Sequence, residues 1–74
     1  MSDIAYLSGV VEQAFNRAIE SPDIRRWKSV SIVAGCAAVR MAADDKPFLA
    51  AQFEGVAEEA RRQALLLLAP KEHA

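Results

Sequence analysis

The sequence predicts an all-α protein, a compact three-helix bundle completed by homodimerisation, with helices over about 3–20, 22–43 and 46–69. Apolar residues recur at spacings of three and four in three separate segments, as they do in amphipathic helices. Turn signals that contain proline divide the segments, and no segment alternates apolar and polar residues as a half-buried strand does. The 74 residues are expected to form one domain, over 1–70, followed by a disordered tail at 71–74.

The first helix is expected to begin at Ser2 or Asp3, where a polar side chain can cap it ahead of the first apolar residue. A continuous apolar stripe, widened by Val10, Phe15 and Ile19, predicts that one face packs against the other helices. The stripe itself consists of Ile4, Leu7, Val11, Ala14 and Ala18.

The second helix is expected to begin at Pro22, because Ser21 suits the N-cap and proline suits the first helical position. Between Val30 and Val39, small and apolar residues cover every side of this helix, which predicts a central element that is buried all round. Gly35 destabilises a helix by about 1 kcal/mol relative to alanine. We therefore expect that it allows another helix backbone to approach closely.

The third helix follows Asp44 and Asp45, which we interpret as capping residues ahead of Pro47. Pro70 is expected to stop it. Gly55 marks a point at which this helix can bend or break.

Composition and charge exclude several classes of function. Nine basic and ten acidic residues give a net charge of −1, without the strongly basic surface that nucleic-acid binding usually needs. A single cysteine favours a reducing compartment, and Cys36 and His73 cannot supply the four ligands of a structural zinc. The start of the chain lacks a secretion signal, and the longest uncharged stretch, 29–39, is shorter than the roughly 20 residues that span a bilayer. We expect a cytoplasmic protein without cofactor, metal or membrane contact. Its composition, rich in alanine and arginine, suggests a bacterial or phage origin.

The most distinctive polar cluster, Arg25, Arg26, Trp27 and Lys28, is a candidate partner-binding site. Tryptophan and arginine are enriched in the hot spots of protein interfaces. The alternative is that Trp27 packs on the first helix while the cations lie in water, because a lone tryptophan at helical spacing usually belongs to the core.

Four consecutive leucines near the end of the third helix cannot all face one neighbour. Leu67 and Leu68 are expected to face the other helices, and Leu65 and Leu66 to begin an exposed patch that serves as a dimer or partner surface. The alternative is that they are ordinary surface leucines near a fraying terminus. The predicted dimer interface combines this patch with the small residues of the second helix: Ser31, Ala34, Gly35, Ala38, Leu65 and Leu66.

The remaining polar residues predict no catalytic site. Glu58, Glu59, Arg61 and Arg62 have the spacing of ion pairs on a solvated helix face, and Cys36 is expected to be a buried structural cysteine. No nucleophile and base occur together, and no glycine-rich phosphate loop is present.

We therefore expect a protein-binding module, and not an enzyme, that acts as a regulator or inhibitor by docking on a larger protein. A secretion-type or assembly chaperone that shields a segment of its client is the alternative. A trihelical nucleic-acid binder is less favoured.

Overall fold

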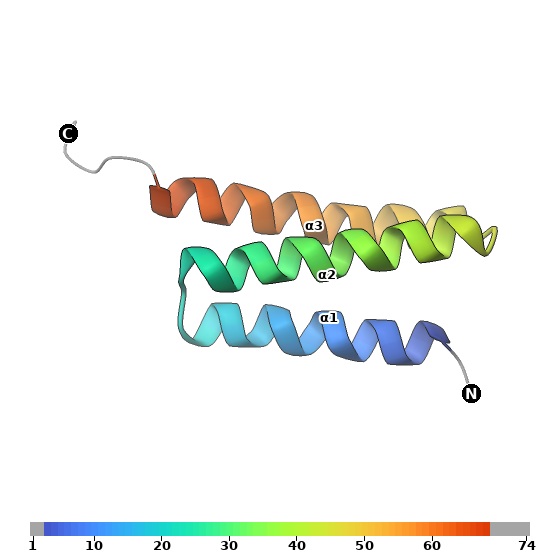
Figure 1. Cartoon of the computed structure of the whole chain (residues 1–74), viewed down its shortest axis with the longest axis horizontal. Helices are drawn as coiled ribbons and strands as arrows, with labels where there is room; N and C mark the ends of the chain where they lie inside the picture. The colour runs from blue at the N-terminus through green and yellow to red at the C-terminus, as the bar shows by residue number, and fades with distance from the viewer. Residues whose placement is uncertain (1–2, 69–74) are drawn as a thin grey trace.

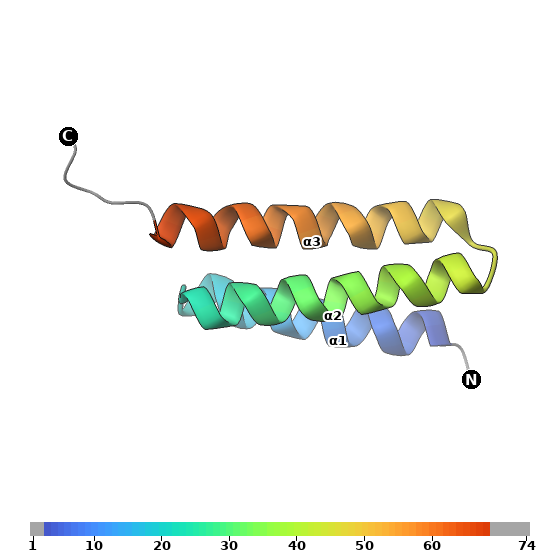
Figure 2. The same ribbon diagram turned by 45° about the horizontal axis from the view of Figure 1, so that its top comes forward.

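A computed structural model describes residues 3–68, which form three α-helices: α1 (Asp3–Glu20), α2 (Ile24–Ala43) and α3 (Pro47–Leu68). Figure 1 shows α2 between α1 and α3, with neighbouring helices antiparallel. In Figure 2 α2 overlaps α1 while α3 stays apart, so the three axes do not lie in one plane. The predicted all-α three-helix bundle is confirmed. The expectations for Ser2 and for residues 69–74, including the disordered tail, lie outside the described residues.

The loop between α1 and α2 is longer than predicted, because α2 begins at Ile24 and not at Pro22. The Ser21 N–H donates to the Arg17 carbonyl oxygen at 3.1 Å, so Ser21 still completes the last turn of α1. Asp23, in extended conformation, is the N-cap of α2, and its carbonyl oxygen accepts the N–H of Trp27 at 3.0 Å. The predicted start of this helix at Pro22 with a Ser21 cap is wrong, because Pro22 and Asp23 are needed to reverse the chain.

The turn between α2 and α3 begins with a Schellman motif. Asp45 has a left-handed backbone with φ 61°, and its N–H donates to the Ala42 carbonyl oxygen at 3.1 Å. The N–H of Lys46 reaches back to the Met41 carbonyl oxygen at 2.8 Å. These two hydrogen bonds satisfy carbonyl groups that the end of a helix otherwise leaves without a partner.

The interpretation of Asp44 and Asp45 as caps for the third helix is therefore wrong. Both residues terminate α2: Asp44 is its C-cap, and its carboxylate lies 3.4 Å from the Arg40 Nε. Lys46 directly precedes α3, and its carbonyl oxygen accepts the N–H of Ala50 at 3.0 Å. Pro47 occupies the first helical position, as expected for a residue without an N–H.

Two clusters of buried side chains hold the helices together along α2. One gathers around Met41, Val11 and Phe53, with small alanines of α2 and α3 between them. The other gathers around Trp27 and Val30, where Ala18 of α1 and alanines of α3 complete the packing. Large residues at the two ends and alanines between them allow α2 and α3 to pack closely over their length.

The prediction that α2 is buried all round is wrong. Its buried residues occupy one face, and on the opposite face Ile32 and Val39 are 65% and 70% exposed. Cys36, predicted to be buried, is exposed between them. The reason is that the residues of α2 that pack against its two neighbours all lie on one half of the helix, so the other half has no neighbour within residues 3–68.

Two further expectations concern α3. The helix runs unbroken through Gly55, so the possible break there does not occur. Leu67 and Leu68 are exposed, and the prediction that they face the other helices is wrong. The last turn of α3 lies beside the polar start of α2, where Lys28 and Ser31 offer Leu68 little apolar surface.

Candidate protein-binding groove

An apolar groove runs between α1 and α3. No Cα atoms of these two helices lie within 8 Å of each other in the described chain, although both helices pack on α2. The space between them has a volume of about 290 Å³ and opens to solvent. Its apolar lining consists of Val11, Phe15, Leu49, Phe53 and Val56.

The floor of the groove is formed by residues that also belong to the core. Val11 and Phe53 are buried and pack with Met41. Phe15 meets Trp27 edge to face, with ring centroids 5.5 Å apart and planes at 78°, a favoured aromatic geometry. A partner would thus meet a preformed apolar surface and would not have to order it first.

The rim of the groove is polar and acidic. Ser8, Glu12 and Gln52 line it beside the apolar residues. Within residues 3–68 the Glu12 carboxylate forms no ion pair, and no basic side chain lines the groove. The arrangement suits an apolar ligand that carries a positive charge at its edge.

The α1 residues of this groove, Val11 and Phe15, were predicted as part of a core-facing stripe and not as a site. The available signal was the width of that stripe, because Phe15 adds apolar surface beyond what one neighbouring helix can cover. Composition alone does not reveal that α1 and α3 stay apart.

The predicted partner-binding cluster separates into two parts in the structure. Trp27 is only 6% exposed and packs on α1 through Phe15, as the alternative interpretation proposed. Arg25, Arg26 and Lys28 are exposed, and none of them forms an ion pair within the described chain. Their contact with a partner stays a prediction, without the tryptophan as its anchor.

The predicted dimer interface is also divided. Ala34 and Ala38 are buried in the chain's own core, although Ala38 also lines a surface hollow, and their role in a dimer stays a prediction. A Cβ atom added at Gly35 would meet nothing within 4 Å, which means that no other helix of the described chain approaches closely there. Ser31 and Leu65 line one surface hollow.

Leu65 and Leu66 are 65% and 61% exposed, as predicted. Leu65 lies on the α2 side of α3, in the hollow with Ser31. Leu66 is the next residue and points about 100° around the helix from it. The structure therefore gives these two leucines different surroundings.

The charged residues of α3 pair along the solvated face. Arg62 bonds the Glu59 carboxylate, as the predicted i,i+3 spacing allows. Arg61, however, forms its ion pair with Glu54, two turns away at 3.3 Å, and not with Glu58. Hydrogen bonds from Gln63 and Arg62 hold the pKa of Glu59 below its usual value of 4.5. In exposed positions such pairs contribute little to stability.

Other classes of site find no support among residues 3–68. No three His, Cys, Asp or Glu side chains gather there as metal ligands do. None of the described helices combines the length and the apolar character that crossing a membrane requires.

Comparison with known proteins gives no match to a family model, to a curated protein or to a solved structure.

Proposed function

We propose that this chain is a protein-binding module that regulates or inhibits a larger protein by holding one of its amphipathic helices in the α1/α3 groove. The proposal is carried by one observation. The parallel helices α1 and α3 both pack on α2, their backbones do not come close to each other, and an apolar groove lies between them. A fourth helix that fills such a channel buries its own apolar face and completes a four-helix arrangement.

The partner helix is defined by the chemistry of the groove. Its apolar residues should recur at i, i+3, i+4 and i+7 to meet Phe15 and Val56 on either side. A lysine or arginine beside that stripe should lie over Glu12, which has no cationic partner among residues 3–68. The exposed thiol of Cys36 fits a reducing compartment, and we place this activity in the cytoplasm.

An assembly chaperone is the second candidate, and the same groove favours it. A chaperone of this kind keeps an open apolar channel for a segment of its client that is not yet folded. An inhibitor instead recognises a helix that is already part of a folded domain. Binding of an isolated helical peptide supports either function, whereas strong preference for the folded domain supports the inhibitor.

The groove is tested by NMR titration of the labelled chain with a designed amphipathic peptide of roughly 18 residues, about the length of α1. Leucines form the apolar stripe, lysines flank it, and a scrambled peptide of equal composition is the control. Backbone shifts are expected at Val11, Phe15 and Val56 and not on the outer side of α2. Shifts spread over the whole surface, or equal binding of the scrambled peptide, would contradict the proposal.

A matched pair of charge reversals tests the rim. Glu12→Lys places a cation beside the groove and is expected to weaken peptide binding at least about tenfold, the effect of about 1.4 kcal/mol. Glu20→Lys makes the same change on the same helix, outside the groove lining. Equal effects of the two variants would show that overall charge, and not the groove, governs binding.

A further inference from the structure

Two hollows lie on the outer surface of the seam between α2 and α3, which we call the α2/α3 face. The leucine hollow, about 320 Å³, lies at the start of α2 and the end of α3 and carries two exposed leucines and two cations. It is lined by Lys28, Ser31, Arg61, Ala64, Leu65 and Leu68. Neither hollow shares a residue with the α1/α3 groove.

The alanine hollow, about 350 Å³, lies at the other end of the same face. Small side chains make it shallow and apolar, and the Glu54 carboxylate at its edge is paired with Arg61. It is lined by Ala38, Val39, Ala42, Ala50, Ala51 and Glu54. One face thus carries large apolar side chains at one end and space lined by alanines at the other.

The two hollows are placed symmetrically about the middle of the face. On α3, Leu65 and Ala51 each lie seven residues from Glu58, and on α2, Lys28 and Ala42 each lie seven residues from Gly35. Seven residues are close to two helical turns, about 10 Å along the axis, so the members of each pair share one side of their helix. A two-fold axis across the face at Gly35 and Glu58 therefore exchanges the two hollows.

We infer that a second copy of this chain binds the α2/α3 face through such an axis, with α2 and α3 each antiparallel to their counterparts. Leu65 of each copy enters the alanine hollow of the other, beside Ala51. The interface is isologous and closed, so it produces a dimer and no longer assembly. This inference does not depend on the proposed function, because the groove lies between α1 and α3 and stays open in the dimer.

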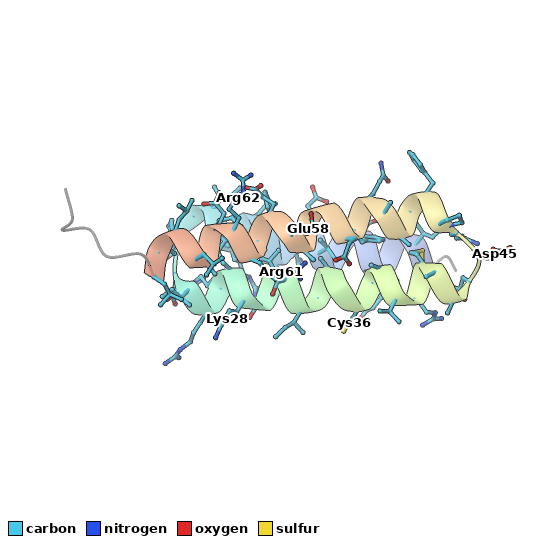
Figure 3. All side chains as sticks on the ribbon, turned by 90° about the horizontal axis from the view of Figure 1, so that it is seen from above. Lys28, Cys36, Asp45, Glu58, Arg61 and Arg62 are labelled. Carbon is cyan, nitrogen blue, oxygen red and sulfur yellow. The ribbon has the colours of Figure 1, made fainter. Side chains whose placement is uncertain are left out.

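Charge supports a second copy as the occupant. Figure 3 shows Lys28 near one end of α2 and Asp45 just beyond the other end. The antiparallel arrangement brings Lys28, which has no ion-pair partner in the described chain, toward Asp45 of the second copy. A parallel arrangement would instead place like charges together, which is unfavourable.

The centre of the α2/α3 face allows the second copy of the chain to approach closely. Space above Gly35 is open, so the backbone of α2 is accessible where the axis passes. Glu58 and Arg61 lie on the same stretch of α3, and Figure 3 shows Arg61 directed toward the seam. Across the axis the two Glu58 side chains meet, and each lies near Arg61 of the second copy, which also pairs with Glu54 of its own chain.

Sedimentation equilibrium of the full chain tests the inference, over concentrations from about 1 µM to about 1 mM, the range of weak to moderate complexes. The expected mass is twice that of the 8.1 kDa chain. Leu65→Glu is expected to weaken the dimer at least tenfold, as loss of an interface hot spot does. Leu66→Glu, the same change at an equally exposed neighbour, is expected to leave it unchanged. Circular dichroism verifies that both variants keep the helical content of the wild-type chain.

A mixing experiment tests the pairing itself. Leu65→Glu and Ala51→Lys are each expected to be monomeric alone, because each spoils both copies of the contact. When the two variants are mixed, one contact becomes a Glu–Lys pair and the other keeps the natural leucine and alanine, so a heterodimer is expected. A monomeric wild-type chain at every concentration overturns the inference. So does a dimer that is insensitive to Leu65→Glu, or a mixture that stays monomeric.

Discussion

Replacing Gly55 by alanine should stabilise the protein, because this glycine has no structural role in α3. The helix continues through it without a break, and a Cβ atom added there meets nothing within 4 Å. Alanine is favoured over glycine inside a helix by about 0.8–1.0 kcal/mol. No clash subtracts from that difference, so the full amount is expected in the free energy of unfolding.

That gain is large for a chain of this size. A domain of this length derives about 3–5 kcal/mol from its core, so one substitution adds about a quarter. The midpoint of thermal unfolding should rise by roughly 4–8 °C. Urea unfolding followed by circular dichroism measures the same change, at one fixed protein concentration because self-association raises apparent stability.

Gly9→Ala is the matched control, since Gly9 is also helical, exposed and surrounded by open space. Both variants should gain about the same amount, near 1 kcal/mol. If Gly55→Ala left stability unchanged or lowered it while Gly9→Ala raised it, the reasoning would fail. Such a result would mean that α3 bends at Gly55, or that another molecule packs there.

Three other substitutions probe the turn, the core and the exposed pairs. Asp45→Gly should raise the free energy of unfolding by up to about 1 kcal/mol, because glycine adopts the left-handed backbone freely, whereas Asp45→Val should lower it by about 1 kcal/mol; urea titration compares them. Trp27→Ala should cost about 3–5 kcal/mol and leave the chain largely unfolded by circular dichroism, while Trp27→Phe should stay folded, since it keeps an aromatic ring beside Phe15. The carboxyl of Glu59 should titrate below pH 4.5 by NMR, and Gln63→Ala should move its pKa upward, because the Gln63 hydrogen bond favours the charged form. Its small contribution to stability is present above the unfolded-state pKa and is lost as the pH falls through the folded-state pKa; a midpoint unaffected by Gln63→Ala would contradict this cause.

The helices and their inward faces were predictable because they depend on local pattern. The stripe from Ile4 to Ala18 specified the buried side of α1, and Ala18 and Val11 are buried as it required. Pro47 marked the start of α3 to within one residue of the predicted bound at 46. In each of these cases the periodicity or the backbone of a single segment carries the information.

The predictions that failed depended on how the helices are arranged relative to one another. The residues from Val30 to Val39 are apolar enough to be buried on all sides, but nothing in their pattern says that α1 and α3 pack against one half of α2. The exposure of Cys36 and the burial of Ala34 both follow from that arrangement. The left-handed Asp45 was missed because aspartate is common both as an N-cap and in left-handed turns.

The loose attachment of α1 has a consequence for how the molecule opens. α2 and α3 are packed closely along their length, whereas the backbone of α1 comes close to α2 alone. Its apolar side chains, among them Val11, Phe15 and Ala18, join the two core clusters. Amide hydrogens of α1 should therefore exchange with solvent through a partial opening that leaves the α2–α3 hairpin intact, at a lower free energy than global unfolding. Any helix that settles between α1 and α3 would close this route, so slowed exchange in α1 would report occupancy of the groove.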